Sequence, residues 1–193
     1  FALASLGPYA KKEEKYYDVE LEFLGRKVAV KIEKVYEGPY ISGFRFDHQD
    51  GEALFFLREI IQYLHFGRTL ITIRKEVLKK KYDDPSWCCL RGEGPTDLVF
   101  RLSNDGKLQE FLITFRLGAR YHELKYENGR YSTAFSQEVE DNSSLRMQVT
   151  KDLDEETIYY TAQILLGFGD LDLFPKISEV LTFCLNFMNE SDK

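Results

Sequence analysis

Polar and apolar residues alternate between residues 17 and 33, on both sides of the pair Gly25-Arg26. Alternation places the apolar side chains on one face of a strand, so two antiparallel strands are predicted here. A two-residue loop that begins with glycine is typical of a type II′ hairpin turn, which sets the register. The predicted pairs are Phe23 with Val28, Leu21 with Val30, Val19 with Ile32 and, on the opposite face, Glu20 with Lys31.

Two further hairpins are predicted later in the chain. Asn128-Gly129 is a preferred type I′ pair between two alternating segments, and residues 103–106 (Ser-Asn-Asp-Gly) form a second loop of turn residues. On the strand that follows residues 103–106, Phe111, Ile113, Phe115 and Leu117 share one face. For the later hairpin the predicted pairs are Glu127 with Arg130, Tyr126 with Tyr131, and His122 with Phe135.

Three helices are predicted, over residues 51–65, 153–166 and 175–189. Asp50 and Asp152 are the predicted N-caps, and Pro175 suits a first helical turn. Glu155 completes a near capping box with Asp152. Residues 51–65 carry apolar side chains almost all round, which is typical of a helix buried on more than one side.

Strands followed by a helix, more strands and two final helices indicate an α+β fold. We expect a largely antiparallel meander sheet with the internal helix and the two C-terminal helices packed on it. Residues 1–14 are interpreted as a flexible N-terminal segment or a cloning scar, and residues 15–193 as a single domain, with a weak seam at 79–86.

Charge is distributed unevenly along the chain, whose net charge is -6. Residues 1–96 hold 16 basic and 15 acidic side chains, whereas residues 138–193 hold 4 and 12. Nucleic-acid binding requires clustered Lys and Arg, so nucleic acid is not expected as a partner. An acidic region instead favours a basic protein partner.

The three cysteines, two of them adjacent, do not form a disulfide framework, which favours a reducing, cytoplasmic location. No apolar run approaches the roughly 20 residues that cross a bilayer, and the N-terminal residues lack the order of a signal peptide. We therefore expect a cytoplasmic protein without a membrane span.

Motifs of the common enzyme classes are absent. The segment VAVK at residues 28–31 lacks the other kinase motifs, and no nucleophile elbow, phosphate-binding loop or zinc-ligand spacing occurs. No cofactor or metal is predicted. Asp47, His48 and Asp50 are weak catalytic candidates, because a base or hard-cation site could form before the helix. The alternative interpretation is that Asp50 caps the helix and the others solvate a loop. His122 is interpreted as part of the sheet rather than as a base.

The segment SWCCLR at residues 86–91 reads as a strand, in which neighbouring side chains point to opposite faces. Cys88 and Cys89 therefore cannot easily converge on one metal or substrate, and both are interpreted as small residues that fill the strand. Trp87 and Arg91 share a face and, with Glu93 in the next turn, are predicted to form a recognition edge.

Other candidates for partner binding are the acidic residues Glu138, Glu140 and Asp141 and the tyrosines Tyr126 and Tyr131. Tyrosine is enriched at protein interfaces, although it also has high strand propensity. The favoured hypothesis is a protein-binding module, of the immunity-protein type, that neutralises a basic partner through an acidic, aromatic-rich face. The alternatives are an enzyme or ligand-binding protein with a pocket near Asp47, His48, Asp50, Arg91 and Glu93, and a structural subunit of a larger assembly. The sequence does not indicate the oligomeric state.

Overall fold

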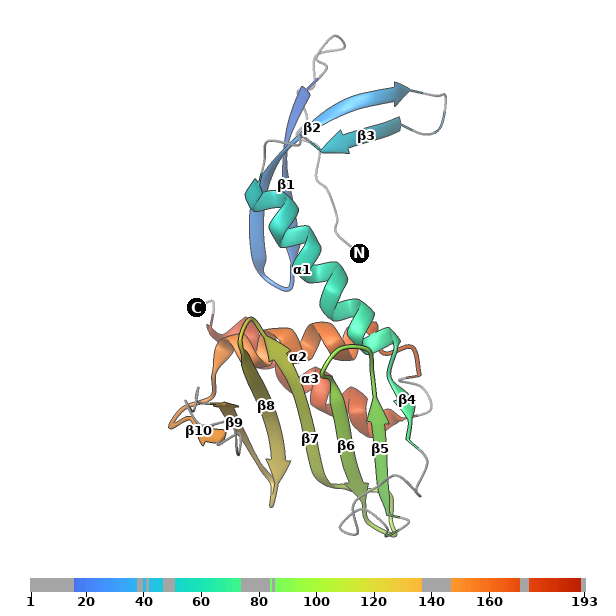
Figure 1. Cartoon of the computed structure of the whole chain (residues 1–193), viewed down its shortest axis with the longest axis vertical. Coiled ribbons are helices and arrows are strands. Elements are labelled where there is room, and N and C mark those ends of the chain that lie inside the picture. Colours follow the sequence, from blue (N-terminus) through green and yellow to red (C-terminus); the bar gives the residue numbers. More distant parts are fainter. Residues whose placement is uncertain are drawn as a thin grey trace. The chain divides into compact units, whose positions relative to one another are not determined.

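The computed structural model describes residues 16–37, 40, 42–46, 51–73, 84, 86–136, 147–170 and 174–191. The fold is α+β, as predicted, with two antiparallel sheets, one internal helix and two C-terminal helices (Figure 1). The chain divides into two compact units, one up to Gln62 and one from Tyr63 to Ser191. Whether residues 15–193 behave as a single domain stays a prediction. In the described part of the chain, no helix has the length and apolar character needed to cross a membrane.

The elements follow the chain in the order β1 (Tyr16–Phe23), β2 (Arg26–Glu37), β3 (Ser42–Phe46), α1 (Gly51–Arg68), β4 (Ile71–Thr72), β5 (Trp87–Arg91), β6 (Asp97–Leu102), β7 (Leu108–Leu117), β8 (Arg120–Glu127), β9 (Arg130–Ser136), β10 (Met147–Val149), α2 (Glu155–Gly167) and α3 (Pro175–Ser191). Helix α1 begins in the first unit and ends in the second.

The first unit contains a three-stranded sheet in the order β1-β2-β3 and the first part of α1. Alternate residues of β1 and β2 form the buried face of the sheet, and α1 packs on it with one side. The buried cluster consists of Val19, Leu21, Val28, Val30, Ile32 and Ala53, with Tyr17, Phe56 and Leu57 packed against it. Burial of this apolar surface is what stabilises the unit.

The β1–β2 turn differs from the prediction. Its loop is Leu24-Gly25, with φ of 51° and 80°, so Phe23 pairs with Arg26 and each predicted pair is wrong by two residues. Two successive residues with positive φ are typical of a type I′ turn, whose twist matches that of the strands. Because the shift is an even number, the same apolar face stays buried.

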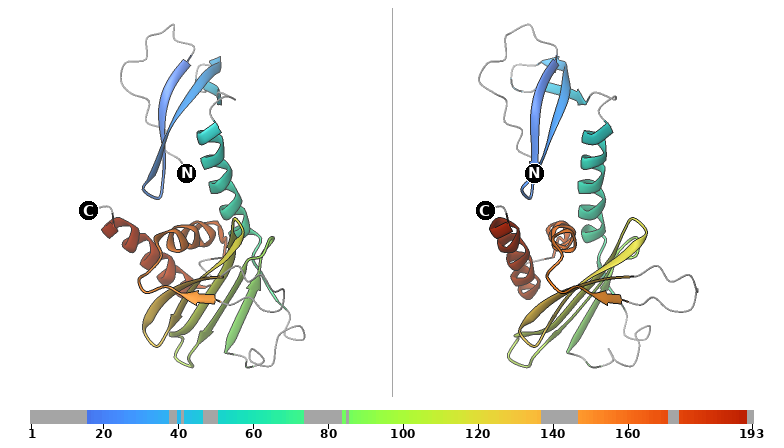
Figure 2. Two further views of the ribbon diagram at one scale, coloured as in Figure 1. Left: turned by 60° about the vertical axis from the view of Figure 1, so that its left-hand side comes forward. Right: turned by 90° about the vertical axis from the view of Figure 1, so that its left-hand side faces the viewer.

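The second unit contains a seven-stranded meander in the order β10-β9-β8-β7-β6-β5-β4. Helices α2 and α3 lie on one face of this sheet (Figure 2). Under them, the buried strand residues include Leu98, Phe100, Phe111, Ile113, Phe115 and Leu124. The hairpin at Asn128-Gly129 has the predicted register, and both turn residues have positive φ, as a type I′ turn requires.

Helix boundaries depart from the prediction by a few residues. Helix α3 begins at Pro175 as expected, whereas α2 begins at Glu155 with Asp154, not Asp152, as its N-cap.

Where α1 meets α2, the backbones are so close that a Cβ on Gly67 would lie 1.8 Å from the Ile164 carbonyl oxygen. A Cβ on Gly167 would likewise lie 2.0 Å from the Leu64 carbonyl oxygen. Glycine at both positions is therefore what permits this crossing.

Candidate functional site

Strand β5 has the predicted alternation, and two of its candidate residues pair with β6. Trp87 lies opposite Arg101, whose guanidinium carbon is 5.5 Å from the centroid of the tryptophan ring. Arg91 donates two hydrogen bonds to the Asp97 carboxylate, at 2.6 and 3.2 Å, and these bonds raise the pKa of Arg91. Both candidates therefore have partners within the chain, and their part in recognition stays a prediction.

The third residue of the predicted recognition edge, Glu93, contacts the end of α1. Its carboxylate lies 2.9 Å from Nε2 of His65, and its backbone N–H donates to the Thr69 hydroxyl at 2.8 Å. Gly94, with φ of 68°, lies against the ring of Phe66. This turn between β5 and β6 thus docks the C-terminal end of α1, which is a structural role for a turn that was predicted to belong to a recognition edge.

The cysteines of β5 occupy the two faces of the strand, as expected. Neither forms a disulfide; Cys89 is buried and Cys88 is half-buried. Burial raises the pKa of Cys88 to about 11 and also raises that of Cys89. Because the thiolate is the nucleophilic form, neither cysteine is suited to attack a substrate near neutral pH.

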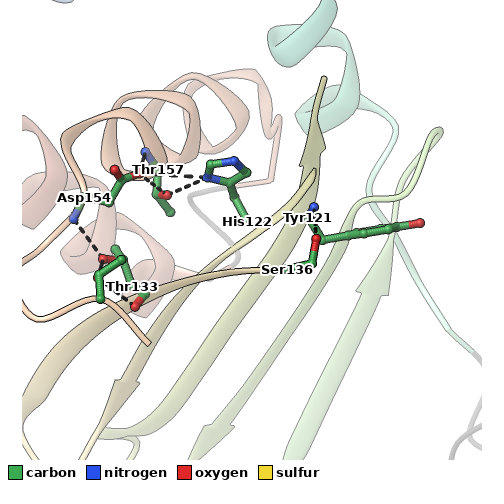
Figure 3. A network of polar contacts seen from close by, with 7 residues as sticks. Tyr121, His122, Thr133, Ser136, Asp154 and Thr157 are labelled. Carbon is green, nitrogen blue, oxygen red and sulfur yellow. Dashed lines mark hydrogen bonds and ion pairs between the residues drawn. The ribbon is translucent and has the colours of Figure 1, made fainter. Parts of the chain in front are cut away.

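The most connected polar network joins β8, β9 and the N-terminus of α2 (Figure 3). The Thr157 hydroxyl donates to Oδ2 of Asp154 at 2.5 Å and lies 2.9 Å from Nδ1 of His122. The backbone N–H of Asp154 donates to the Thr133 hydroxyl at 2.8 Å, and that hydroxyl contacts Thr150 at 2.5 Å. Asp154 caps the helix by accepting from the backbone N–H of Thr157. The network therefore fixes the first turn of α2 to the sheet.

His122 is buried between aromatic side chains of neighbouring strands. Its ring stacks on Phe115 at 5.9 Å between centroids and lies 6.4 Å from that of Phe135. Since the Thr157 proton goes to Asp154, Nδ1–H of His122 is the donor to Thr157. Burial lowers the pKa of His122, against the opposing effect of Asp154 at 3.9 Å, so the neutral ring is favoured.

A neutral histidine with a fixed tautomer is the form that a general base needs. Within the described residues, however, Nε2 makes no hydrogen bond to a nucleophile or to any other side chain. The arrangement therefore supports the interpretation of His122 as part of the sheet. The sequence pattern did not predict the partners of His122. Asp154 and Thr157 are three residues apart, which is the spacing between an N-cap and a residue whose backbone N–H the N-cap side chain accepts from.

The tyrosine candidates of the β8–β9 hairpin belong to an aromatic stack. Tyr126 and Tyr131 are cross-strand partners with centroids 4.9 Å apart, and Tyr131 stacks on Phe183 of α3 at 3.6 Å. Burial also raises the pKa of Tyr131. Both tyrosines are half-buried, so much of their area serves packing between the sheet and α3. A role in partner binding stays a prediction.

The remaining candidates lie outside the described residues. These are Asp47, His48 and Asp50 before α1, and Glu138, Glu140 and Asp141 between β9 and β10. Where the structure is described, no group of three or more His, Cys, Asp or Glu side chains is arranged to hold a metal ion. Of the predicted site residues, Trp87 and Arg91 are brought to one face, Glu93 lies in the next turn, and Tyr126 lies beside Tyr131.

The sequence pattern does not predict that large apolar residues of α1 are exposed. Leu54, Phe55 and Ile61 are exposed by 39%, 63% and 66%, whereas Ala53 belongs to the buried cluster and Phe56 and Leu57 pack against it. The expectation that this helix is buried on more than one side is therefore wrong for its first half. The apolar residues all round this helix were visible in the sequence. If the helix's own unit covers only part of such a surface, the remaining apolar residues need another contact surface.

In comparisons with known protein families, curated proteins and solved structures, no match to this chain is found.

Proposed function

We propose that this chain is a protein-binding module and that exposed apolar residues of α1 in its first unit contact the partner. The observation that carries the proposal is the exposure of Leu54, Phe55 and Ile61 on the part of the helix that belongs to the first unit. Exposed clusters of large apolar residues are typical of surfaces that associate with other proteins. An amphipathic helix that presents such residues is also a recurrent recognition element.

The pairing within the second unit supports assigning recognition to the first. Arg91 is bonded to Asp97, Glu93 to His65, and Tyr131 is stacked on Phe183. A partner that used the polar groups of Arg91 or Glu93, or the ring face of Tyr131, would compete with these contacts within the chain. Phe55 and Ile61 already expose most of their surface, so contact with a partner removes apolar area from water without breaking such a bond.

We further propose that the partner is basic and that the chain acts in the cytoplasm, as an immunity-type protein would. The acidic excess of residues 138–193 supports a basic partner, because opposite charges steer association. Cys88, Cys89 and Cys184 are all outside disulfides, which supports a reducing compartment.

The proposal is tested with tagged wild-type chain and the double variant Phe55→Ser/Ile61→Ser, expressed in the native cells. Quantitative co-purification is expected to identify a protein that is enriched with the wild type and reduced at least about tenfold with the variant, the loss expected when an interface anchor is truncated. Ile71→Ser is the matched control, because Ile71 is 70% exposed but lies on β4.

Equal recovery with the double variant, or equal loss with Ile71→Ser, would contradict the proposed surface. The charge reversal Glu138→Lys/Asp141→Lys tests the basic partner separately. We expect weaker capture whose loss is largest at low salt, because charge interactions are screened as ionic strength rises. Unchanged capture would rule out the acidic face while leaving the α1 surface supported.

A further inference from the structure

The two sheets have four edges, and three of them are protected against pairing with another strand. Strand β10 has three residues and β4 has two, which are too short to be useful templates. Strand β1 carries Asp18, Glu20 and Glu22 on its exposed face, where a second copy would bring like charges together. Charges and short edge strands are the usual means by which proteins avoid edge pairing.

The outer edge of β3 has neither kind of protection. Its sequence, SGFRF, has no proline and a single charge, Arg45, which forms an ion pair with Glu33 of β2. In the described part of the chain β3 pairs only with β2. Phe44 and Phe46 are exposed by 39% and 38%, so, within the described residues, this edge combines backbone groups that no other strand pairs with and partly exposed aromatic rings.

The β1–β2 turn determines which backbone groups face outward at that edge. In a two-residue hairpin the closing pair, here Phe23 and Arg26, exchanges both hydrogen bonds, and such pairs then alternate along the strands. Glu33 therefore directs its N–H and C=O toward Arg45 of β3. By the same alternation, the N–H and C=O groups of Phe44 point away from β2 and toward the open edge.

We propose that two copies of this chain associate through an antiparallel pairing of β3 with β3 of the second copy, centred on Phe44. In this register Phe44 exchanges both of its backbone hydrogen bonds with its counterpart, which the outward groups of both copies allow. Arg45 lies opposite Gly43 of the second copy and not opposite a second arginine. A register centred on Arg45 would instead place two like charges directly across from each other, which is destabilising.

The side chains on the inner face favour the same register. Tyr17 of β1 and Phe44 already form an edge-to-face pair with centroids 5.9 Å apart. Pairing at Phe44 makes the two Phe44 rings cross-strand neighbours at the interface between the two copies. Each of them is then flanked by the Tyr17 ring of its own copy. Aromatic cross-strand pairs contribute beyond the area they bury. The proposed dimer is independent of the α1 surface, which remains available in each copy.

Analytical ultracentrifugation of the full chain tests the dimer over a roughly hundredfold range of concentration, because self-association follows mass action. The weight-average mass is expected to rise from the monomer value of 22.6 kDa toward twice that value. Phe44→Lys is expected to hold the chain at the monomer mass, since lysine protects edge strands. Val149→Lys, at a 66% exposed position on the edge strand β10, is expected to dimerise like the wild type. A wild type that stays at the monomer mass, or equal loss in both variants, would overturn the proposal.

Disulfide trapping tests the register without depending on how Phe44→Lys folds. Phe44→Cys and Phe46→Cys place a thiol at two positions of similar exposure on one face of β3. In the proposed register only the residues at position 44 are directly opposite, with Cα atoms about 5.5 Å apart, within disulfide reach. With diamide as oxidant, Phe44→Cys is expected to form a covalent dimer at least about tenfold faster than Phe46→Cys, whose copies lie out of reach. Equal rates would refute the register.

A variant at Phe55 and Ile61 is expected to leave the rate of disulfide trapping unchanged, which separates this result from the proposed function.

Discussion

The two units treat their apolar and charged residues differently. In the second unit the sheet face beneath α2 and α3 is covered, and the charged side chains of β5 and its turn are paired across strands or to α1. In the first unit part of α1 is covered by β1 and β2, while other positions of α1 and the outer strand β3 keep large apolar residues exposed. A residue type that attracts attention in the sequence therefore has a different meaning in each unit.

This difference shows why residue type alone is a poor guide to a partner-binding surface. Trp87, Arg91 and Glu93 looked like a recognition edge, yet each has an intramolecular partner that explains its presence. Phe55 and Ile61 looked like ordinary core residues of a buried helix, yet they are exposed. The contacts that a residue makes within the chain, which depend on the whole fold, distinguish the two cases more clearly than residue type does.

The comparison is tested most strongly by removing the same side chain in each unit. Ile113 is fully buried in the second unit, so Ile113→Ala is expected to lower the free energy of unfolding by about 3 kcal/mol, through lost burial and a cavity. Ile61→Ala is expected to change it by less than about 0.5 kcal/mol, because Ile61 is mostly exposed. Urea unfolding measures both. A large loss for Ile61→Ala would mean that the α1 surface is covered within the chain, which would contradict the proposed function.

The second unit also contains a buried histidine, His122, whose protonation is expected to change the stability of the chain. Burial lowers the pKa of His122 below its ordinary value of 6.5, so between those two pKa values the unfolded chain binds more protons than the folded chain. The free energy of unfolding is therefore expected to fall as the pH drops below 6.5, and to level off below the folded pKa. The change comes from the burial that disfavours charge, opposed by Asp154 and Glu156 and reinforced by Arg120.

Urea unfolding of the wild type and His122→Gln at several values between pH 5 and pH 7.5 checks this prediction. At pH 7.5 the histidine is neutral in both states, so the difference there measures only the lost packing and hydrogen bond. We expect a shallower decline in the free energy of unfolding toward pH 5 for the variant. Parallel curves would show that His122 does not titrate differently in the folded and unfolded chains.

Much of the fold could be predicted because its information is local. Period-two alternation and turn residues identified the β6–β7 and β8–β9 hairpins, and Pro175 marked the start of α3. The pairing of Arg91 with Asp97 was also accessible, since the turn between them sets their register. The contact between His65 and Glu93, and that between His122 and Thr157, join segments far apart in sequence, so no local pattern announces them. The exposure of Phe55 likewise depends on what else covers α1.

The two type I′ hairpins give the finest comparison, because the same turn was read correctly in one unit and wrongly in the other. Asn128-Gly129 uses residues that adopt positive φ easily, whereas Leu24-Gly25 holds a leucine at a φ of 51°. A left-handed conformation costs an ordinary L-residue roughly 1–2 kcal/mol, and asparagine less. Leu24 is therefore a poor signal for a type I′ turn, which explains why the predicted turn, Gly25-Arg26, lies one residue too late.

Leu24→Asn is expected to stabilise the first hairpin by roughly 0.5–1 kcal/mol, because it removes most of that strain. The reciprocal change Asn128→Leu is expected to destabilise the second hairpin by a similar amount. Amide hydrogen exchange of β1–β2 and β8–β9 in each variant reads the two hairpins separately, and 1 kcal/mol corresponds to about a fivefold change in protection. If Leu24→Asn lowered protection in β1–β2, contacts of the half-buried Leu24 side chain would outweigh its backbone strain. Packing of the Leu24 side chain would then specify the turn, and an apolar loop residue would contribute to the stability of the first unit.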